Sequence, residues 1–370
     1  MFKIIKGRSI YMHPVKKILI LVIVLLAFFI IYNLLKSRQA IKINYMKNIK
    51  EGFDEGVSSE GVSSEGVSSK GVSSEGVSIS ALPEKYQSLP IREFIVKSSY
   101  NSAVNNKNIA TKDQIRYVLE RGCRLIDFEI YSRNNIEFVS YSEDPEYQSM
   151  DTKNEESSRL SLGDAFNTVV GYAFTSPSPS PNDPLFVSLR IKNNESETYS
   201  RIAKLIDYAF KNKLYKGDIT GETKLEELMG KVVIILDITS SSKYKSLVRC
   251  PNSAPCFSNY VNIEAGSIHL PKYTYGNLET LPQKPAMTSN ELRTDIKTFM
   301  MITPAQMDQL KSPNPADIIS KVYPQFFLYK FYKPGKELQE YEDVFNSNQT
   351  ALVPVSIIVG QERINNASQK

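Results

Sequence analysis

The strongest constraint on this chain is the alternation of short apolar runs with helical patterns between residues 82 and 363. Eight runs have the length and composition of buried strands: 92–99, 123–131, 136–142, 185–191, 231–239, 296–303, 326–332 and 355–359. Four stretches between them have helical spacing: 111–122, 161–174, 197–212 and 314–323. In the third of these, Ile202, Leu205, Ile206 and Phe210 share one helical face.

Strands that alternate with helices are typical of an α/β fold with a mostly parallel sheet. About eight strands in a domain of this length predict a (β/α)8 TIM barrel. Helical patterning is poor over residues 239–295, so we expect the barrel to be distorted rather than regular.

A second constraint lies near the N-terminus, where residues 18–35 form an uncharged apolar run. As a helix this run would span roughly 27 Å, close to the hydrocarbon thickness of a bilayer. It ends in Asn33-Leu34-Leu35-Lys36, which offers no small-residue cleavage site. We therefore predict a single-pass transmembrane helix that follows a basic tail, residues 1–17, and that holds the protein in a lipid bilayer.

Residues 36–81 are predicted to be a disordered linker, because residues 55–78 repeat the unit EGVSS. Each unit has one valine, too little apolar surface to offset the entropy of ordering. A β-solenoid is the alternative, but it needs more apolar positions per turn. The barrel should then occupy residues 82–363, and residues 364–370 should form a C-terminal tail.

The orientation in the membrane is weakly marked, because five Lys/Arg lie before the apolar run and five follow it within residues 36–50. Three glycosylation sequons, at Asn194, Asn348 and Asn366, favour a large C-terminal domain on the lumenal or external side. Cys250 and Cys256 bracket a short segment; they form either a bridge, in an oxidising compartment, or two free thiols.

The charge distribution argues against nucleic acid as a partner. All basic excess lies in residues 1–50, which hold ten Lys/Arg and no Asp/Glu, while the remaining residues carry a net charge of −5. Phosphate binding along a nucleic acid needs clustered basic residues, and no basic stripe is present.

Several ordered motifs resemble the X domain and the bacterial relatives of the phosphatidylinositol-specific phospholipase C family. These are "IVKSSYNSA" (95–103), "YVLERGCRLIDFEIY" (117–131), "SLGDAFNTVVGYAF" (161–174), "PLFVSLRIKNN" (184–194), "LEELMGKVVIILD" (225–237) and "PQFFLYKFYKPGKELQEYEDVFN" (324–346). The resemblance covers roughly residues 90–350 and implies a barrel of the PLC-like phosphodiesterase type.

The family's chemistry needs two histidines, and neither is found at its expected position. The first falls at Tyr100, and tyrosine, with a pKa near 10, is a poor base at neutral pH. The second should lie in the stretch 138–144, which contains no histidine. The chain has two histidines, of which His13 precedes the apolar run and His269 matches no catalytic position.

The calcium site that the resemblance implies is also altered. Asn101 matches one ligand, and Asp127 and Glu129 match an acidic pair whose i, i+2 spacing on a strand points both into the barrel mouth. The last ligand falls at Arg190, and a guanidinium cannot bind Ca²⁺. We therefore expect no metal or other cofactor, and a contact between Arg190 and one of the acids within hydrogen-bonding distance.

Three hypotheses about function follow. The first is a membrane-anchored, catalytically inactive PLC-like barrel that binds a phosphoinositide headgroup, a glycan or a protein. It is favoured because Asp237 also replaces a phosphate-binding lysine of the family. The second is a phosphoric diester hydrolase that uses Tyr100, Asp127 and Glu129 by an altered mechanism. The third is a tethered surface protein without a ligand.

The repeat and the Asn/Lys/Ile/Ser-rich composition resemble proteins of large DNA viruses.

Overall fold

The computed structural model describes residues 77–141, 158–193, 195–241, 243–248, 250, 255–276, 299–304 and 312–368. The predicted anchor and nearly all of the linker lie outside these residues. Within the described part of the chain, no helix is both long enough and apolar enough to cross a bilayer.

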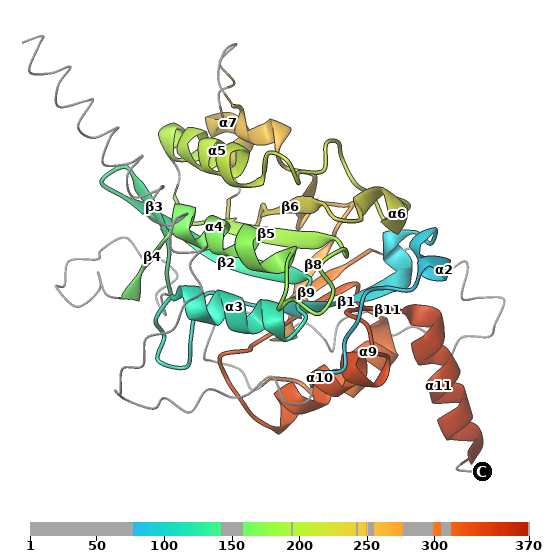
Figure 1. The fold of residues 1–370 in the computed structure, drawn as a ribbon. Helices are drawn as coiled ribbons and strands as arrows, with labels where there is room; N and C mark the ends of the chain where they lie inside the picture. Colours follow the sequence, from blue (N-terminus) through green and yellow to red (C-terminus); the bar gives the residue numbers. More distant parts are fainter. Residues whose placement is uncertain are drawn as a thin grey trace, which may run out of the picture. The chain divides into compact units, whose positions relative to one another are not determined.

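Eight parallel strands form a nearly closed barrel, which confirms the predicted fold class (Figure 1). The strands are β1 (Phe94–Ser99), β2 (Leu125–Arg133), β5 (Leu185–Ile191), β6 (Val232–Asp237), β7 (Ile263–Ala265), β8 (Lys272–Thr274), β9 (Met301–Thr303) and β10 (Phe326–Tyr329). Their order around the barrel follows the sequence, and β10 pairs with β1. Among the described residues β7 and β8 are not paired with each other, so the barrel has one open seam there.

The observed strands differ from the predicted ones in three respects. Residues 136–142 contain a strand, β3 (Ile136–Val139), but it pairs antiparallel with β2 and with β4 (Leu160–Ser161) and lies outside the barrel wall. Residues 355–359 are not a strand, because they begin α11 (Val355–Ser368); the neighbouring strand is β11 (Leu352–Pro354), which pairs antiparallel with β1. The barrel strands β7 and β8 come from the region that showed no clear pattern.

The four predicted helices are all present. They are α3 (Lys112–Glu120), α4 (Leu162–Ala173), α5 (Ser196–Phe210) and α9 (Pro315–Val322); Figure 1 shows α3, α4 and α5 side by side along β2 and β5. Thr111 and Ser161 cap the first two, since each hydroxyl accepts a hydrogen bond from a backbone N–H of the first turn. The remaining helical elements are α2 (Glu84–Gln87), α6 (Leu225–Leu228), α7 (Tyr244–Leu247), α10 (Lys336–Ser347) and the 3₁₀ turns η1 (Ile91–Glu93) and η3 (Phe257–Asn259).

Residues 77–93 form a strap across the base of the barrel, the end at which the parallel strands begin. Backbone and side-chain hydrogen bonds join it to the segments before β5, β6 and β10: Leu82 to Asp183, Ile91 to Thr223, and Arg92 to Gln325. Ile79 packs over Gly122, which has φ +82°, and a Cβ on that glycine would lie 2.7 Å from the Ile79 side chain. The packed chain therefore includes residues before the expected boundary at residue 82.

A buried ion cluster lies on the outer side of β1, where α10 covers the barrel. Glu342 accepts hydrogen bonds from Lys97 Nζ at 3.0 Å and from Arg121 Nε at 2.8 Å, and Lys97 also donates to the Arg121 carbonyl at 2.6 Å. Lys97 is 0% exposed, and burial lowers its pKa despite the attraction of Glu342. The cluster joins α10 to β1 and to the end of α3, so it holds together elements far apart in the sequence.

The Arg-Gly-Cys-Arg motif that carries part of the family resemblance therefore has a structural role here. Arg121 belongs to the ion cluster, and Arg124 is fully buried. The Arg124 guanidinium donates to the Ala173 carbonyl at 2.9 Å and to the hydroxyls of Ser178 and Ser180 at 2.8 and 2.9 Å. It thus orders the connection between α4 and β5.

Candidate functional site

The candidate site lies at the barrel mouth, where the parallel strands end. Asp127 and Glu129 alternate on β2 with Phe128, whose ring packs outward against Phe166 of α4. Both carboxylates therefore face the barrel interior, as their spacing predicted. The adjacent strand β5 brings Arg190 into register with Glu129.

Arg190 contacts both acids at the mouth, so the predicted guanidinium–carboxylate contact is confirmed. Its Nε lies 3.2 and 3.1 Å from the two Asp127 oxygens, and a terminal nitrogen lies 2.9 Å from Asp127 Oδ2. The other terminal nitrogen lies 3.4 Å from Glu129 Oε2. This forked arrangement matches the geometry that makes arginine–carboxylate pairs strong.

The charge on Arg190 is retained although the side chain is buried. Burial disfavours the charged form, but the negative charges of Asp127 and Glu129 outweigh it, and the pKa of Arg190 lies above its ordinary value. The cation therefore stays between the two acids over the whole physiological pH range.

Asn101 adds an amide to the same cluster. Its side-chain oxygen accepts a hydrogen bond from Arg190, and its backbone N–H donates to Asp127 Oδ2 at 3.1 Å. The residue has φ +47°, a left-handed conformation that asparagine adopts more readily than most residues. The turn after β1 thus points the backbone N–H of Asn101 towards Asp127 on β2 and its side chain towards Arg190 on β5.

Tyr100 packs its ring against the guanidinium of Arg190. The Arg190 guanidinium carbon is 4.4 Å from the ring centroid, within the range of a cation–π interaction. Tyr100 is 5% exposed, and burial raises the pKa of its phenol above the ordinary value. The phenol therefore stays neutral at neutral pH, and the ring at the first histidine position packs against the guanidinium of Arg190.

Three further polar residues of the mouth were not predicted from the sequence. Lys192 Nζ lies 3.3 Å from Glu129, Lys272 Nζ lies 2.6 Å from Asp237, and Ser188 Oγ donates to Asp127 at 2.9 Å. Ser188 and Lys192 flank Arg190 at spacings of two on β5, so strand alternation could have identified them. Nothing in the sequence links Lys272 to Asp237. Lys272 lies on β8 and Asp237 on β6, and these strands come close to each other only in the folded barrel.

Asp237 does not present a free negative charge to the mouth. Burial opposes its ionisation, but Lys272 and the hydroxyl of Thr239 outweigh that effect, and the pKa of Asp237 lies below its ordinary value. In the described mouth, the three carboxylates of Asp127, Glu129 and Asp237 each contact a cation from Arg190, Lys192 or Lys272.

The residues that the resemblance places at a calcium site do not fit a divalent cation. The side-chain oxygens of Asn101, Asp127 and Glu129, which would be the ligands, all contact Arg190 instead. Calcium needs six to eight oxygen ligands, and a guanidinium among them repels it. In the part of the chain that the structure describes, no three His, Cys, Asp or Glu residues are grouped as a metal site.

One of the two histidines of the chain, His269, lies within the described residues. His269 is exposed in the connection between β7 and β8, and its backbone N–H donates to Ser267 Oγ. His13 lies outside the described residues. The described part of the stretch expected to hold the second histidine, residues 138–141, contains Ser140, which is fully buried.

The fold is a nearly closed parallel barrel with a polar cluster at its mouth, and comparisons with known proteins indicate which barrels it resembles. Residues 87–236 match the model of the family "Phosphatidylinositol-specific phospholipase C, X domain". This match supports the family that the sequence motifs indicated, over the half-barrel that contains Tyr100, Asp127 and Arg190. No curated protein sequence matches the chain.

Solved structures agree on the fold. The crystal structure of PLC21 from L. pealei has a TM-score of 0.54 and 14% identity, covering 72% of this chain and 37% of that one. PLC21 from S. officinalis has a TM-score of 0.51 and 13% identity, with the same coverage. At such identities the similarity shows the fold alone. The chain matches 37% of each of these two relatives, so their activities do not transfer with it.

Proposed function

We propose that residues 82–363 form a non-catalytic PLC-like binding module, displayed on a membrane by residues 18–35 and spaced from it by the linker. The observation that carries this proposal is the position of Arg190. Its guanidinium contacts the side-chain oxygens of Asn101, Asp127 and Glu129 at the place where the family's cation would be held. The chain thus replaces a dissociable metal by a covalently attached cation.

The pairing of charges also bears on the kind of partner. Lys192 and Lys272, which would attract a phosphate, already contact Glu129 and Asp237. A phosphoinositide headgroup would have to break these ion pairs, and would meet three carboxylates within the cluster. An uncharged partner, such as a glycan or a neutral protein surface, does not meet this cost, and we rank it above a phosphoinositide.

A phosphoric diester hydrolase with an altered mechanism is the alternative. It is favoured by the fold and by the carboxylates that remain at the mouth. It would need Asp127 or Glu129 to act on a substrate while Arg190 is bound to both. The viral origin indicated by the composition stays a prediction.

We expect the purified barrel to cleave phosphatidylinositol no faster than buffer, with or without Ca²⁺. Tyr100→His should not restore turnover, because the second histidine and the metal site are still missing and each acid/base group is typically worth about two to four decades in rate. The measurement is release of inositol phosphate, with an active phospholipase C in the same vesicles as a positive control. Turnover by the unmodified chain that is lost in Asp127→Ala would show that the hydrolase alternative is correct.

Binding is measured in parallel, with vesicles that contain phosphoinositides, vesicles that do not, and an array of neutral and charged glycans. Retention on neutral glycans supports the ranking given above. Selective binding to phosphoinositide vesicles would overturn it while leaving the non-catalytic assignment in place.

The anchor leads to a separate expectation. Because the run 18–35 is long enough to span a bilayer and lacks a cleavage site, the full chain should stay in the membrane pellet after washing at alkaline pH. A chain that starts at residue 71 keeps the strap and should appear in the soluble fraction. Release of the full chain by the same wash would contradict the anchor.

A further inference from the structure

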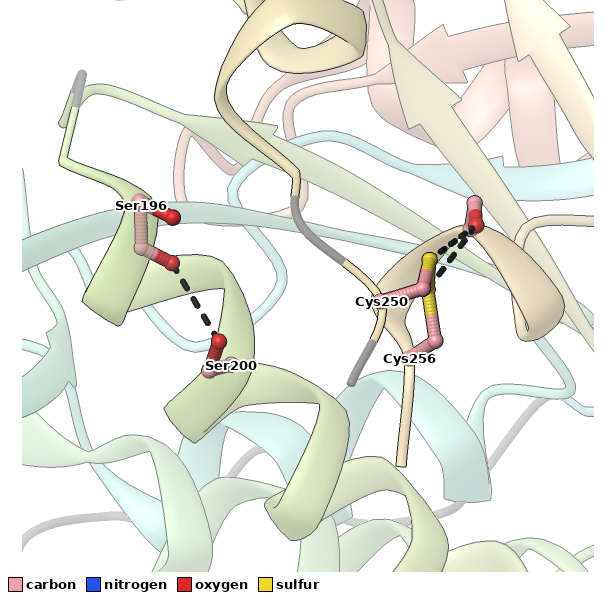
Figure 2. Close-up of a disulfide and its surroundings, with 5 residues drawn as sticks. Ser196, Ser200, Cys250 and Cys256 are labelled. Atoms are coloured by element: carbon pink, nitrogen blue, oxygen red, sulfur yellow. Dashed lines mark hydrogen bonds between the residues drawn. A yellow bond between two sulfur atoms is a disulfide. The ribbon is translucent and has the colours of Figure 1, made fainter. Parts of the chain in front are cut away.

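We propose that Cys250 and Cys256 form a structural disulfide, and that the barrel therefore matures in an oxidising compartment, across the membrane from residues 1–17. The sequence alone left both a bridge and two free thiols open. The structure joins the two sulfurs (Figure 2) and supplies the reasons why this pair, and not another, is oxidised.

The first reason is that the packed core fixes the position of Cys256. This residue is 4% exposed and directly precedes Phe257, which is 1% exposed. The Phe257 ring packs edge-on against Tyr199 of α5, with centroids 5.3 Å apart, and against Tyr244 of α7 at 6.5 Å. A cysteine held beside such an aromatic cluster has little freedom to move away from a partner.

The second reason is that Cys250 lies within bonding reach. The two Cα atoms are 4.9 Å apart, inside the range of about 4.4–6.8 Å in which disulfides are found. Ser258 Oγ lies 3.5 Å from the sulfur of Cys250 and 3.1 Å from that of Cys256. Since disulfide sulfurs only accept, the hydroxyl donates, and it links the bridge to η3.

The third reason is that the remaining cysteine cannot compete. Cys123 is fully buried at the start of β2, on the base side of the barrel, and burial raises the pKa of its thiol. Thiol–disulfide exchange needs an accessible thiolate, which Cys123 does not provide. The chain therefore has one available pairing, and it cannot scramble within the folded barrel.

Oxidation of the pair has a simple balance. Cys250 and Cys256 lose two protons and two electrons as the S–S bond forms. The electrons reduce the disulfide of a protein oxidoreductase of the thioredoxin-like class, which leaves as a dithiol. Such oxidants act in the secretory lumen and the bacterial periplasm, whereas cytosolic thiols are kept reduced. A disulfide that closes a short loop stabilises the folded chain less than one that closes a long loop. This bridge therefore depends on an oxidising compartment to form.

The existence of the bond does not rest on the proposed function, but the orientation does, since it uses the anchor at residues 18–35. The three sequons lie on the same side of that anchor as the bridge. Both features are thus consistent with a barrel that has crossed the membrane.

The experiment uses the full chain, tagged at each end and expressed in cultured eukaryotic cells. Cells are quenched in acid, free thiols are blocked with N-ethylmaleimide in SDS, and the sample is reduced and labelled with maleimide-PEG. We expect two added PEG groups in the unmodified chain and in Cys123→Ser, and none in Cys250→Ser or Cys256→Ser. No added PEG in the unmodified chain would overturn the proposal, and the readout does not depend on folding of the variants.

The compartment is tested in sealed microsomes from the same cells. A protease added outside should remove the N-terminal tag and spare the C-terminal tag. Digestion of the C-terminal tag in a chain that carries the bond would contradict the inferred compartment. If the full chain is released at alkaline pH while the disulfide is intact, only the proposed membrane anchor is contradicted. If phosphodiesterase turnover is measured, only the non-catalytic assignment is contradicted.

Discussion

Arg190→Ala should lower the free energy of unfolding of the barrel by about 3–5 kcal/mol, because it leaves buried carboxylates without their cation. Asp127 is fully buried and Glu129 is 6% exposed, so neither can be rehydrated without disturbing the barrel wall. The substitution also removes the guanidinium that covers the Tyr100 ring. The measurement is chemical denaturation of the soluble barrel, followed by tyrosine fluorescence and far-ultraviolet circular dichroism.

The matched control is Lys192→Ala, two residues further along β5. Lys192 contacts the same Glu129, but its side chain is 27% exposed and reaches solvent. Its loss should cost below about 1 kcal/mol, as for other ion pairs near the surface. Equal losses in the two variants would show that Arg190 is not the internal counter-ion of the mouth.

A charge reversal at the same position tests the comparison with a metal ion. Arg190→Glu places another carboxylate beside Asp127 and should be less stable than Arg190→Ala without added metal. Added Ca²⁺ should raise the unfolding midpoint of Arg190→Glu and leave the unmodified chain unchanged, since only the variant offers an oxygen-rich cluster without an internal cation. A calcium effect of the same size in the unmodified chain would contradict our account of the site.

Glu342→Gln should have an effect at least as large, about 3–5 kcal/mol, because one carboxylate serves two buried cations. The variant keeps the shape of the side chain but leaves Lys97 and Arg121 without a counter-charge. The control is Glu340→Gln in the same helix, which loses an i, i+4 pair with the exposed Lys336 and should change stability by about 0.5 kcal/mol or less.

The pH dependence of the Glu342→Gln loss follows from Lys97. Burial already lowers the pKa of Lys97 in the folded chain, and removal of Glu342 lowers it further. When the pKa of a lysine is lower in the folded than in the unfolded chain, the folded protein gains stability as the pH rises from the folded pKa towards the unfolded pKa, about 10.4. The stability difference between the variant and the unmodified chain should therefore shrink from pH 7 to pH 10. A difference that is independent of pH would indicate lost packing rather than an unpaired charge.

Local patterns in the sequence determined the helices and most of the central strands. The apolar face of α5 recurs every three to four residues, and Ile202, Ile206 and Phe210 of that face are buried in the core. Such a period is a property of the segment itself, so it can be identified without knowledge of the fold. The i, i+2 spacing of Asp127 and Glu129, and the opposite charge of Arg190, likewise predicted a contact that depends on two adjacent strands only.

Only the tertiary structure determined which strands pair with each other. The run at 136–139 forms a strand, yet β3 pairs antiparallel with β2 instead of joining the barrel wall, because an apolar run does not encode its neighbour. The β-branched segment after Pro354 begins a helix, so its packing environment outweighs strand propensity. Strands β7 and β8 have three residues each, too few for any period to be read.

The same distinction applies to the site. The sequence by itself determined that the two histidines of the family are missing, because residue 100 is a tyrosine and residues 138–144 contain no histidine. Only the folded barrel decided how the remaining charges are neutralised. Lys272 reaches Asp237 across the seam strand β7, and Glu342 reaches Lys97 from a helix 245 positions along the chain. Ion pairs of this kind depend on distance in space, and closure of the barrel sets that distance.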